Sequence, residues 1–252
     1  MKRLKFLVFI LAITIFSCNS INKPLIPEIG DYDLYEPYDF PLKPGMPEWA
    51  DLSPSEMPEV LQIPDDILKR LSTRALVETC LNYPMFFLFT ASSSNPKDGI
   101  WWVMNGFNGF GELFLRQDAF RCLFEKYEPF DLNLVVMEGN LSTKFLYLEI
   151  LICQDEIIEN MNYKERILLL KESYSKYKKM LWGGEKVYGY HSYNFTLYLM
   201  ATLLVALDEP DIKVEINDNE NIKLLLNTMR LPNGTDREIE ILVNRIINKR
   251  NH

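Results

Sequence analysis

Apolar side chains recur at helical spacing through most of the chain beyond residue 52. A period near 3.6 residues predicts amphipathic helices, whereas a half-buried strand would alternate apolar and polar positions. Only residues 132–137 favour a short strand. The pattern predicts helices over about residues 53–63, from 65 onward, 73–83, 97–106, 108–127 with a break near 118, 142–160, 163–181, 191–207, 219–229 and 236–249.

Helix-start signals and two strongly apolar segments indicate how these helices pack. Ser53 and Glu56 have the spacing of a capping box, and Ser72 is placed to cap another helix. Residues 195–207 are apolar nearly all round, which at this length predicts a helix buried inside a bundle. Residues 239–247 carry a one-sided apolar stripe, which must pack on a neighbour.

A short internal echo favours stacked helical hairpins over a closed four-helix bundle. The segment LSTRAL, residues 71–76, is matched 70 residues later by LSTKFL, residues 141–146. That offset is about two hairpins of the size found in TPR or HEAT repeats, although generic helix-start chemistry explains the match equally well. The predicted fold is all-α, either stacked HEAT- or TPR-like hairpins or an irregular helical bundle.

The first 18 residues have the pattern of a bacterial lipoprotein signal. Basic residues at positions 2, 3 and 5 precede an apolar run over residues 6–16, which is too short to span a bilayer. The tetrapeptide IFSC, which ends at Cys18, resembles a lipobox. This resemblance implies that residues 1–17 are removed and that Cys18 carries palmitate or similar acyl chains. An ordinary cleaved signal and an uncleaved anchor are the alternatives.

Residues 18–52 are expected to form the lipidated cysteine and a proline-rich tether, in front of a single α-helical domain over residues 53–252. Six prolines between residues 24 and 47 argue against a regular element. The same segment contains four aromatic residues, which a purely flexible spacer would not need. We therefore expect part of it to lie against the domain; the four are Tyr32, Tyr35, Tyr38 and Phe40.

Charge and cysteine content narrow the range of partners. The signal holds three of the 27 basic residues and none of the 35 acidic ones, which leaves 24 against 35 and a formal charge of −11. This negative charge argues against binding to nucleic acid, and against an additional electrostatic attraction between the domain and anionic lipid. Cys80, Cys122 and Cys153 lack CxxC spacing and have apolar neighbours, so they are expected to be buried thiols, with one disulfide left open.

Two stretches in the first half of the domain resemble a family of bacterial lipoproteins. The first runs from Leu71 to Pro84 and the second from Arg116 to Tyr127. They are similar to the "ST..L..T.L.YP" and "R.DA...L..KY" elements of uncharacterised lipoproteins of Bacteroidota. The resemblance implies a helical, membrane-anchored protein, and it brings no assigned activity.

Side chains suited to nucleophilic catalysis are few. His191 is the only histidine before the terminal His252, and it is accompanied by neither a GxSxG elbow nor a cysteine-protease signature. A hydrogen-bonded structural histidine is therefore the simpler interpretation. Asp155 and Glu159 lie one helical turn apart, but on a polar stretch without aromatic neighbours, so a glycosidase pair is not favoured. No catalytic residue is predicted.

Metal and nucleotide sites are not favoured either. The chain lacks HExxH and other clusters with ligand spacing. Residues 217–221 offer oxygen ligands for calcium, but the stretch lacks the glycine and the terminal glutamate of an EF-hand loop. A helix cap at Asp218 or Asn219 is a simpler explanation. Glycines 106, 109 and 111 do not follow a strand, as a dinucleotide loop would. No metal or cofactor is predicted.

Two aromatic clusters supply the candidate ligand-binding residues. Flat rings at a surface groove would stack on sugars or anchor a peptide, although core packing of Trp101 and its neighbours is the stronger competing explanation. The first cluster surrounds the tryptophan pair, and the second lies near residue 190. The candidates are Trp101, Trp102, Tyr188, Tyr190, His191 and Tyr193.

Together these features predict a noncatalytic protein- or peptide-interaction module anchored to the bacterial envelope membrane through acylated Cys18. The outer membrane is favoured, with the domain facing the periplasm or the cell surface. A protein or peptide is the expected partner and nucleic acid is not. An envelope hydrolase or a glycan-binding lipoprotein is the alternative.

Overall fold

The computed structural model describes residues 28–53, 55–91, 95–135, 139–183 and 185–249. Within these ranges every regular element is a helix and no strand forms, apart from one isolated parallel bridge between Leu34 and Leu71. The prediction of an all-α fold is confirmed. In the same ranges, no helix combines the length and the apolar character that crossing a bilayer requires.

The described helices of the first half are at most 10 residues long, and the four longest described helices lie in the second half. The first half contains α1 (Pro47–Ala50), α2 (Met57–Val60), α3 (Asp65–Leu68), α4 (Thr73–Leu81), the 3-10 helix η1 (Phe86–Ala91), α5 (Pro96–Asn105), α6 (Asn108–Leu115), α7 (Ala119–Tyr127) and α8 (Leu132–Val135). The second half contains α9 (Gly139–Ile152), α10 (Asp155–Asn160), α11 (Tyr163–Gly183), α12 (Glu185–Ala206), α13 (Pro210–Asp218), α14 (Glu220–Thr228) and α15 (Thr235–Lys249).

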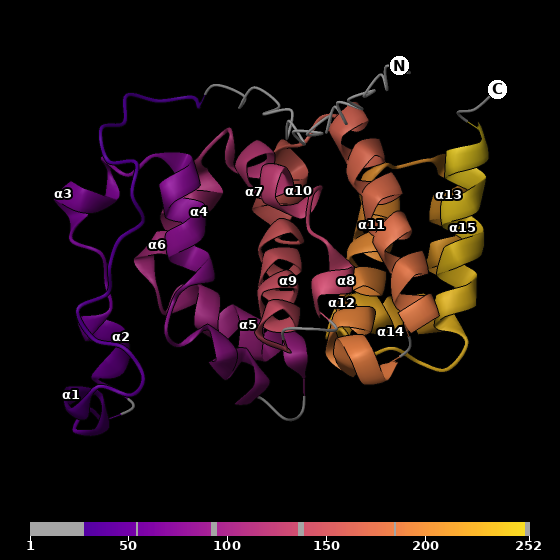
Figure 1. Ribbon diagram of the computed structural model, residues 1–252. Coiled ribbons are helices and arrows are strands. Elements are labelled where there is room, and N and C mark those ends of the chain that lie inside the picture. The colour runs from indigo at the N-terminus through magenta and orange to yellow at the C-terminus, as the bar shows by residue number, and fades with distance from the viewer. Residues whose placement is uncertain (1–27, 54, 92–94, 136–138, 184, 250–252) are drawn as a thin grey trace, which may run out of the picture.

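The helices succeed one another across the molecule, from α4 on one side to α15 on the other (Figure 1). Along this row α7 packs on α9, α9 on α12, and α12 on both α11 and α15. Residues 194–201 of α12 are buried without interruption, which confirms the buried helix predicted there. The stripe of α15 is buried as well, at Ile239, Leu242, Val243 and Ile246.

Local signals explain where several helices begin. The Ser72 side chain accepts a hydrogen bond from the Ala75 amide at 3.2 Å, and so caps α4 as predicted. Asn219 caps α14 in the same way, accepting from the Ile222 amide at 3.0 Å. Glu56 accepts from the Ser53 amide at 2.9 Å, but α2 begins only at Met57, with Glu56 in the N-cap position and no side-chain cap. The helix start predicted at Ser53 is therefore wrong.

Some predicted elements were wrong. The short strand expected over residues 132–137 is helix α8 as far as Val135, and residues 136–138 lie outside the described ranges. Asp131 accepts a hydrogen bond from the Asn133 amide at 2.9 Å, an N-terminal turn that favours the helix, and α8 packs on α9 and α11. Tertiary packing thus overrides the β-propensity of this apolar run.

Other boundaries also moved. Helix α13 was not predicted, and residues 142–160 form two helices, which separate at Cys153 and Gln154. Helix α12 begins at Glu185, six residues before the expected start. The sequence echo does not mark equivalent helix starts, because Ser72 precedes α4 whereas Ser142 lies within α9. A stacked arrangement is therefore supported by the packing of successive helices along the row. The sequence echo does not support it.

Residues 28–40, here called the N-terminal strap, run along α4. The Leu34 carbonyl accepts from the Ser72 amide at 2.7 Å, and the Tyr38 amide donates to the Thr79 hydroxyl at 2.9 Å. Phe40 is buried against Tyr83 and Phe107. As the aromatic residues indicated, part of the proline-rich segment is attached to the helical body.

Candidate functional site

One buried charged cluster, the Asp118 centre, locks the strap onto the helices. Both carboxylate oxygens of Asp118 are engaged, one by the Ile29 amide at 2.7 Å and the other by the Thr73 hydroxyl at 2.9 Å. Arg116 donates to the Leu71 and Leu68 carbonyls at 2.6 and 3.1 Å. The Tyr32 ring covers its guanidinium, with 4.3 Å from the centroid to Cζ. The "R.DA" element therefore has a structural role here.

Glu28, Asp118 and Cys122 bring three ligand-type atoms within 4.8 Å of one another, the arrangement that a metal ion would need. Their chemistry does not suit a cation. Arg74 forms an ion pair with Glu28 at 2.8 Å, and each carboxylate oxygen of Asp118 already accepts a hydrogen bond. Burial is the main cause that raises the pKa of the Cys122 thiol to about 12, so the sulfur stays protonated and a poor ligand. The three residues lie close together because Glu28 and Asp118 attach the strap to the helices.

A second buried cluster, the Glu149 centre, was not predicted from the sequence. Glu149 of α9 is 1% exposed. The Tyr127 hydroxyl donates to its carboxylate at 2.9 Å, and the Thr196 hydroxyl lies 2.8 Å from both carboxylate oxygens. Burial raises the pKa of Glu149 to about 8, against the opposing effect of these hydrogen bonds. A lone carboxylate within the apolar run LYLEILI was the signal that could have revealed it.

Lys176 of α11 supplies positive charge next to this centre. Its ammonium donates to the Glu128 and Phe130 carbonyls at 3.2 and 3.1 Å and pairs with Glu172 at 3.0 Å. The same nitrogen lies 5.1 Å from the centroid of the Tyr127 ring. Because Glu149 and Lys176 are both buried and engaged, neither can meet a substrate without local opening of the fold.

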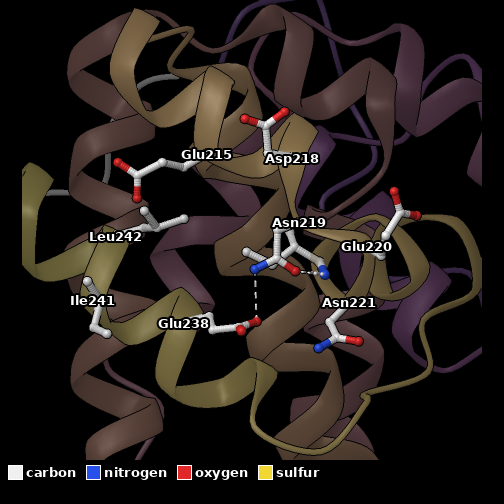
Figure 2. A pocket seen from close by; sticks show the side chains of 9 residues that line it. Glu215, Asp218, Asn219, Glu220, Asn221, Glu238, Ile241 and Leu242 are labelled. Atoms are coloured by element: carbon white, nitrogen blue, oxygen red, sulfur yellow. Dashed lines mark hydrogen bonds between the residues drawn. The ribbon is translucent and has the colours of Figure 1, made fainter.

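Helices α13, α14 and α15 border a shallow hollow of about 510 Å³, here called the acidic groove. Figure 2 shows the carboxylates around its rim, where Glu215, Asp218 and Glu220 point away from one another. Ile241 is exposed on one side of the groove. The groove is lined by Glu215, Asp218, Asn219, Glu220, Asn221, Ile222, Glu238, Ile241 and Leu242.

The acidic groove does not gather its oxygen atoms as a calcium site would. Asn219, which caps α14, also donates through Nδ2 to Glu238 at 3.0 Å. Glu215 is paired with Arg245, and Glu220 with Lys223 at 2.5 Å. Much of the negative charge at the rim is therefore already paired with basic side chains. Helix capping and surface ion pairs account for this stretch, and the predicted helix cap at Asn219 is confirmed.

A further groove lies between α5, α6 and the start of α10, with Tyr198 of α12 and Met229 also contributing. We call it the aromatic groove. Its volume is about 350 Å³. Trp101 lines it and is 67% exposed, and its neighbour Trp102 is 48% exposed. The complete lining is Lys97, Ile100, Trp101, Met104, Asn105, Gly111, Phe114, Cys153, Gln154, Asp155, Glu156, Tyr198 and Met229.

The expectation that Trp101 belongs to the core is wrong. Helix α5 buries the face that carries Ile100, Val103 and Met104. The two tryptophans lie on the opposite, solvent-facing side of the helix. Phe107 and Phe110, from the same sequence cluster, are core residues whose rings pack edge to face, with 5.1 Å between their centroids. The cluster is therefore divided between the core and the surface.

Polar groups surround an apolar floor in the aromatic groove. Ile100, Met104, Tyr198 and Met229 are buried beneath it. Lys97 donates to the Leu226 carbonyl at 3.2 Å, and its ammonium lies 5.9 Å from the Tyr198 ring centroid. On the side of α10, Gln154 is half-buried and two carboxylates are exposed to solvent; these are Asp155 and Glu156.

Of the second predicted aromatic cluster, the structure describes the side chain of Tyr193, which does not line this groove. Tyr193 is half-buried, and its hydroxyl lies 3.4 Å from that of Tyr177 on α11 and 3.2 Å from the Asp236 carboxylate on α15. The backbone of Tyr188, Tyr190 and His191 is in α12, but their side chains lie outside what the structure describes. Cys18 also lies outside the described residues. Asp155 and Glu159 are both exposed on α10.

The remaining cysteines behave as expected of buried thiols. Cys80, Cys122 and Cys153 are free and buried, and the disulfide that the sequence left open does not form among them. Burial raises the pKa of Cys153, beside the aromatic groove, so that thiol is a weak nucleophile.

No family model matches the chain, and neither does any curated protein or solved structure. The resemblance to Bacteroidota lipoproteins therefore stays a prediction.

Proposed function

We propose that this chain is a noncatalytic binding module, held at the bacterial envelope membrane by acylated Cys18, and that the aromatic groove is its binding site. The exposure of Trp101 carries this proposal. Leaving apolar surface in water costs about 25 cal/mol per Å², and tryptophan is among the residues that dominate binding energy at interfaces. An exposed ring beside a groove of ligand size is suited to recognition.

The placement of the ionisable groups supports binding rather than catalysis. The carboxyl with a strongly raised pKa, Glu149, lines neither the aromatic nor the acidic groove. Glu149 instead joins α9 to α7 and α12 through Tyr127 and Thr196. A catalytic acid must reach its substrate within hydrogen-bonding distance, so this carboxyl is better suited to a structural role.

The lipid anchor rests on the signal-like sequence that ends at Cys18. Nine residues, 19–27, separate that cysteine from the strap. A chain of this length spans at most about 30 Å. An acylated Cys18 would therefore keep the helical body close to the membrane surface, because the strap is bonded to the body from Glu28 onward.

Incorporation of an alkyne-labelled palmitate into the full chain, expressed in a bacterium, tests the anchor. We expect label in the wild type and none in Cys18→Ser. Equal labelling of both would refute acylation at Cys18.

Affinity capture with the full chain from an envelope lysate tests the binding module. Protein and glycan fractions are both quantified, and Trp101→Ala is compared with Trp182→Ala. Trp182 is the comparison residue, because it is 91% exposed at the end of α11 and lines a separate hollow of about 500 Å³. The two variants therefore also test which of the two hollows binds the partner. We expect a saturable partner that is lost with Trp101→Ala and retained with Trp182→Ala. A partner retained equally by both variants, or converted to product by the wild type, would contradict the proposal.

A further inference from the structure

We infer that the ligand of the aromatic groove is a neutral saccharide, of which one or two rings stack on Trp101. This inference rests on the proposed function and specifies its ligand class. The sequence favoured a protein or peptide partner, with a glycan as the alternative. The shape and polarity of the groove favour that alternative.

The size of the groove fits a small ring better than a folded partner. A volume of about 350 Å³ lies at the lower end of the range for small-molecule sites. A stable protein partner would cover about 800 Å² on each side, so it would have to contact much surface outside the groove. The exposed indole of Trp101 offers a flat apolar face, on which the C–H face of a pyranose ring can lie.

The polar rim of the groove combines both signs of charge. Lys97 contributes an ammonium from α5, while Asp155 and Glu156 contribute exposed carboxylates from α10. An anionic ligand would meet the two carboxylates, and a cationic ligand would meet the ammonium. A neutral sugar avoids both conflicts, because each hydroxyl can donate to a carboxylate and accept from a nitrogen.

Two amides add acceptors to this rim. Asn105 donates through Nδ2 to the Trp101 carbonyl at 2.8 Å, and Gln154 donates through Nε2 to the Ile150 carbonyl at 2.6 Å. These bonds fix the orientation of both amides and leave their oxygens to accept from a ligand. Fixed acceptors near a flat aromatic face restrict a sugar ring to few orientations.

Titration calorimetry of the full chain in detergent tests the ligand class. The neutral probes are maltohexaose, cellohexaose, xylohexaose, mannohexaose and chitohexaose, and the charged comparators are oligogalacturonate and oligolysine. We expect at least one neutral oligosaccharide to bind, and to bind at least tenfold more tightly than either comparator. Trp101→Ala should weaken that binding at least tenfold, Trp101→Phe should restore part of it, and Trp182→Ala should leave it unchanged.

The outcomes separate this inference from the proposed function. If no neutral probe binds, or if a charged comparator binds more tightly, the saccharide assignment is overturned, while a Trp101-dependent partner in the capture experiment would still support the binding module. Saccharide binding that is unaffected by Trp101→Ala also overturns the assignment to this groove. If the chain shortens a bound oligosaccharide, the ligand class stands and the noncatalytic function fails.

Discussion

The Glu149 centre and the aromatic groove place carboxylates in opposite environments. At Glu149, burial raises the pKa to about 8, and the carboxyl is bonded to residues of two neighbouring helices. In the aromatic groove, Asp155 and Glu156 are exposed beside a tryptophan that packing leaves in solvent. A strongly shifted pKa is often a sign of a functional site. At Glu149 it results instead from burial where α9 packs on its neighbouring helices. The features suited to recognition lie instead at the surface.

The largest expected effect is on stability, at the Glu149 centre. Glu149→Ala removes the partner of Tyr127 and Thr196 and leaves a cavity, so we expect the free energy of unfolding to fall by about 3–5 kcal/mol. Denaturant unfolding followed by circular dichroism measures it. Glu159→Ala, at an exposed carboxylate of α10, is the control and should change stability by less than about 0.5 kcal/mol. A loss below about 1 kcal/mol for Glu149→Ala would contradict the structural role.

The next effect concerns the strap. Asp118→Ala removes the acceptor of the Ile29 amide and of the Thr73 hydroxyl. We expect a loss of about 2–3 kcal/mol and faster amide hydrogen exchange at residues 28–40. Asp118→Asn, which keeps one acceptor, should lose less. Unchanged exchange in the strap would show that Asp118 does not hold it.

The pH dependence of stability should also identify Glu149. Its pKa is about 8 in the folded chain, against 4.5 for an ordinary glutamate. The folded state keeps a proton that the unfolded state releases, so stability falls as pH rises from about 4.5 to about 8. The slope from this group is at most about 1.4 kcal/mol per pH unit. Glu149→Gln should flatten this part of the profile. An identical profile in both proteins would place the titration elsewhere.

The smallest stability effect is expected at the aromatic groove. Trp101→Ala should change the free energy of unfolding by less than about 0.5 kcal/mol, because most of the ring is already in solvent. Phe110→Ala, from the same sequence cluster but fully buried, should cost about 3–5 kcal/mol. Thermal unfolding of the two variants compares them directly. A similar loss for both would mean that Trp101 is a packing residue.

Helical periodicity and capping signals predicted most of this fold, because they are local. The Ser72 cap, the break near Asp118 and the buried α12 all follow from neighbouring residues. The strand expected at residues 132–137 failed, since contacts with α9 and α11 decide the conformation there.

The candidate site was predicted only in part. Trp101 was named as a candidate, but periodicity alone could not say which side of α5 faces the core. Asp155, Glu156 and Tyr198 join it from α10 and α12, distant in sequence, so no local pattern could have grouped them. The Glu149 centre likewise depends on Tyr127, Thr196 and Lys176, which three different helices supply.

The most direct test compares one variant from each region in the same binding titration. The full chain, Trp101→Ala and Glu149→Gln are titrated with the neutral oligosaccharide that binds the wild type most tightly. The account predicts at least tenfold weaker binding for Trp101→Ala and unchanged binding for Glu149→Gln. Loss of binding in a folded Glu149→Gln protein, with wild-type affinity in Trp101→Ala, would contradict it.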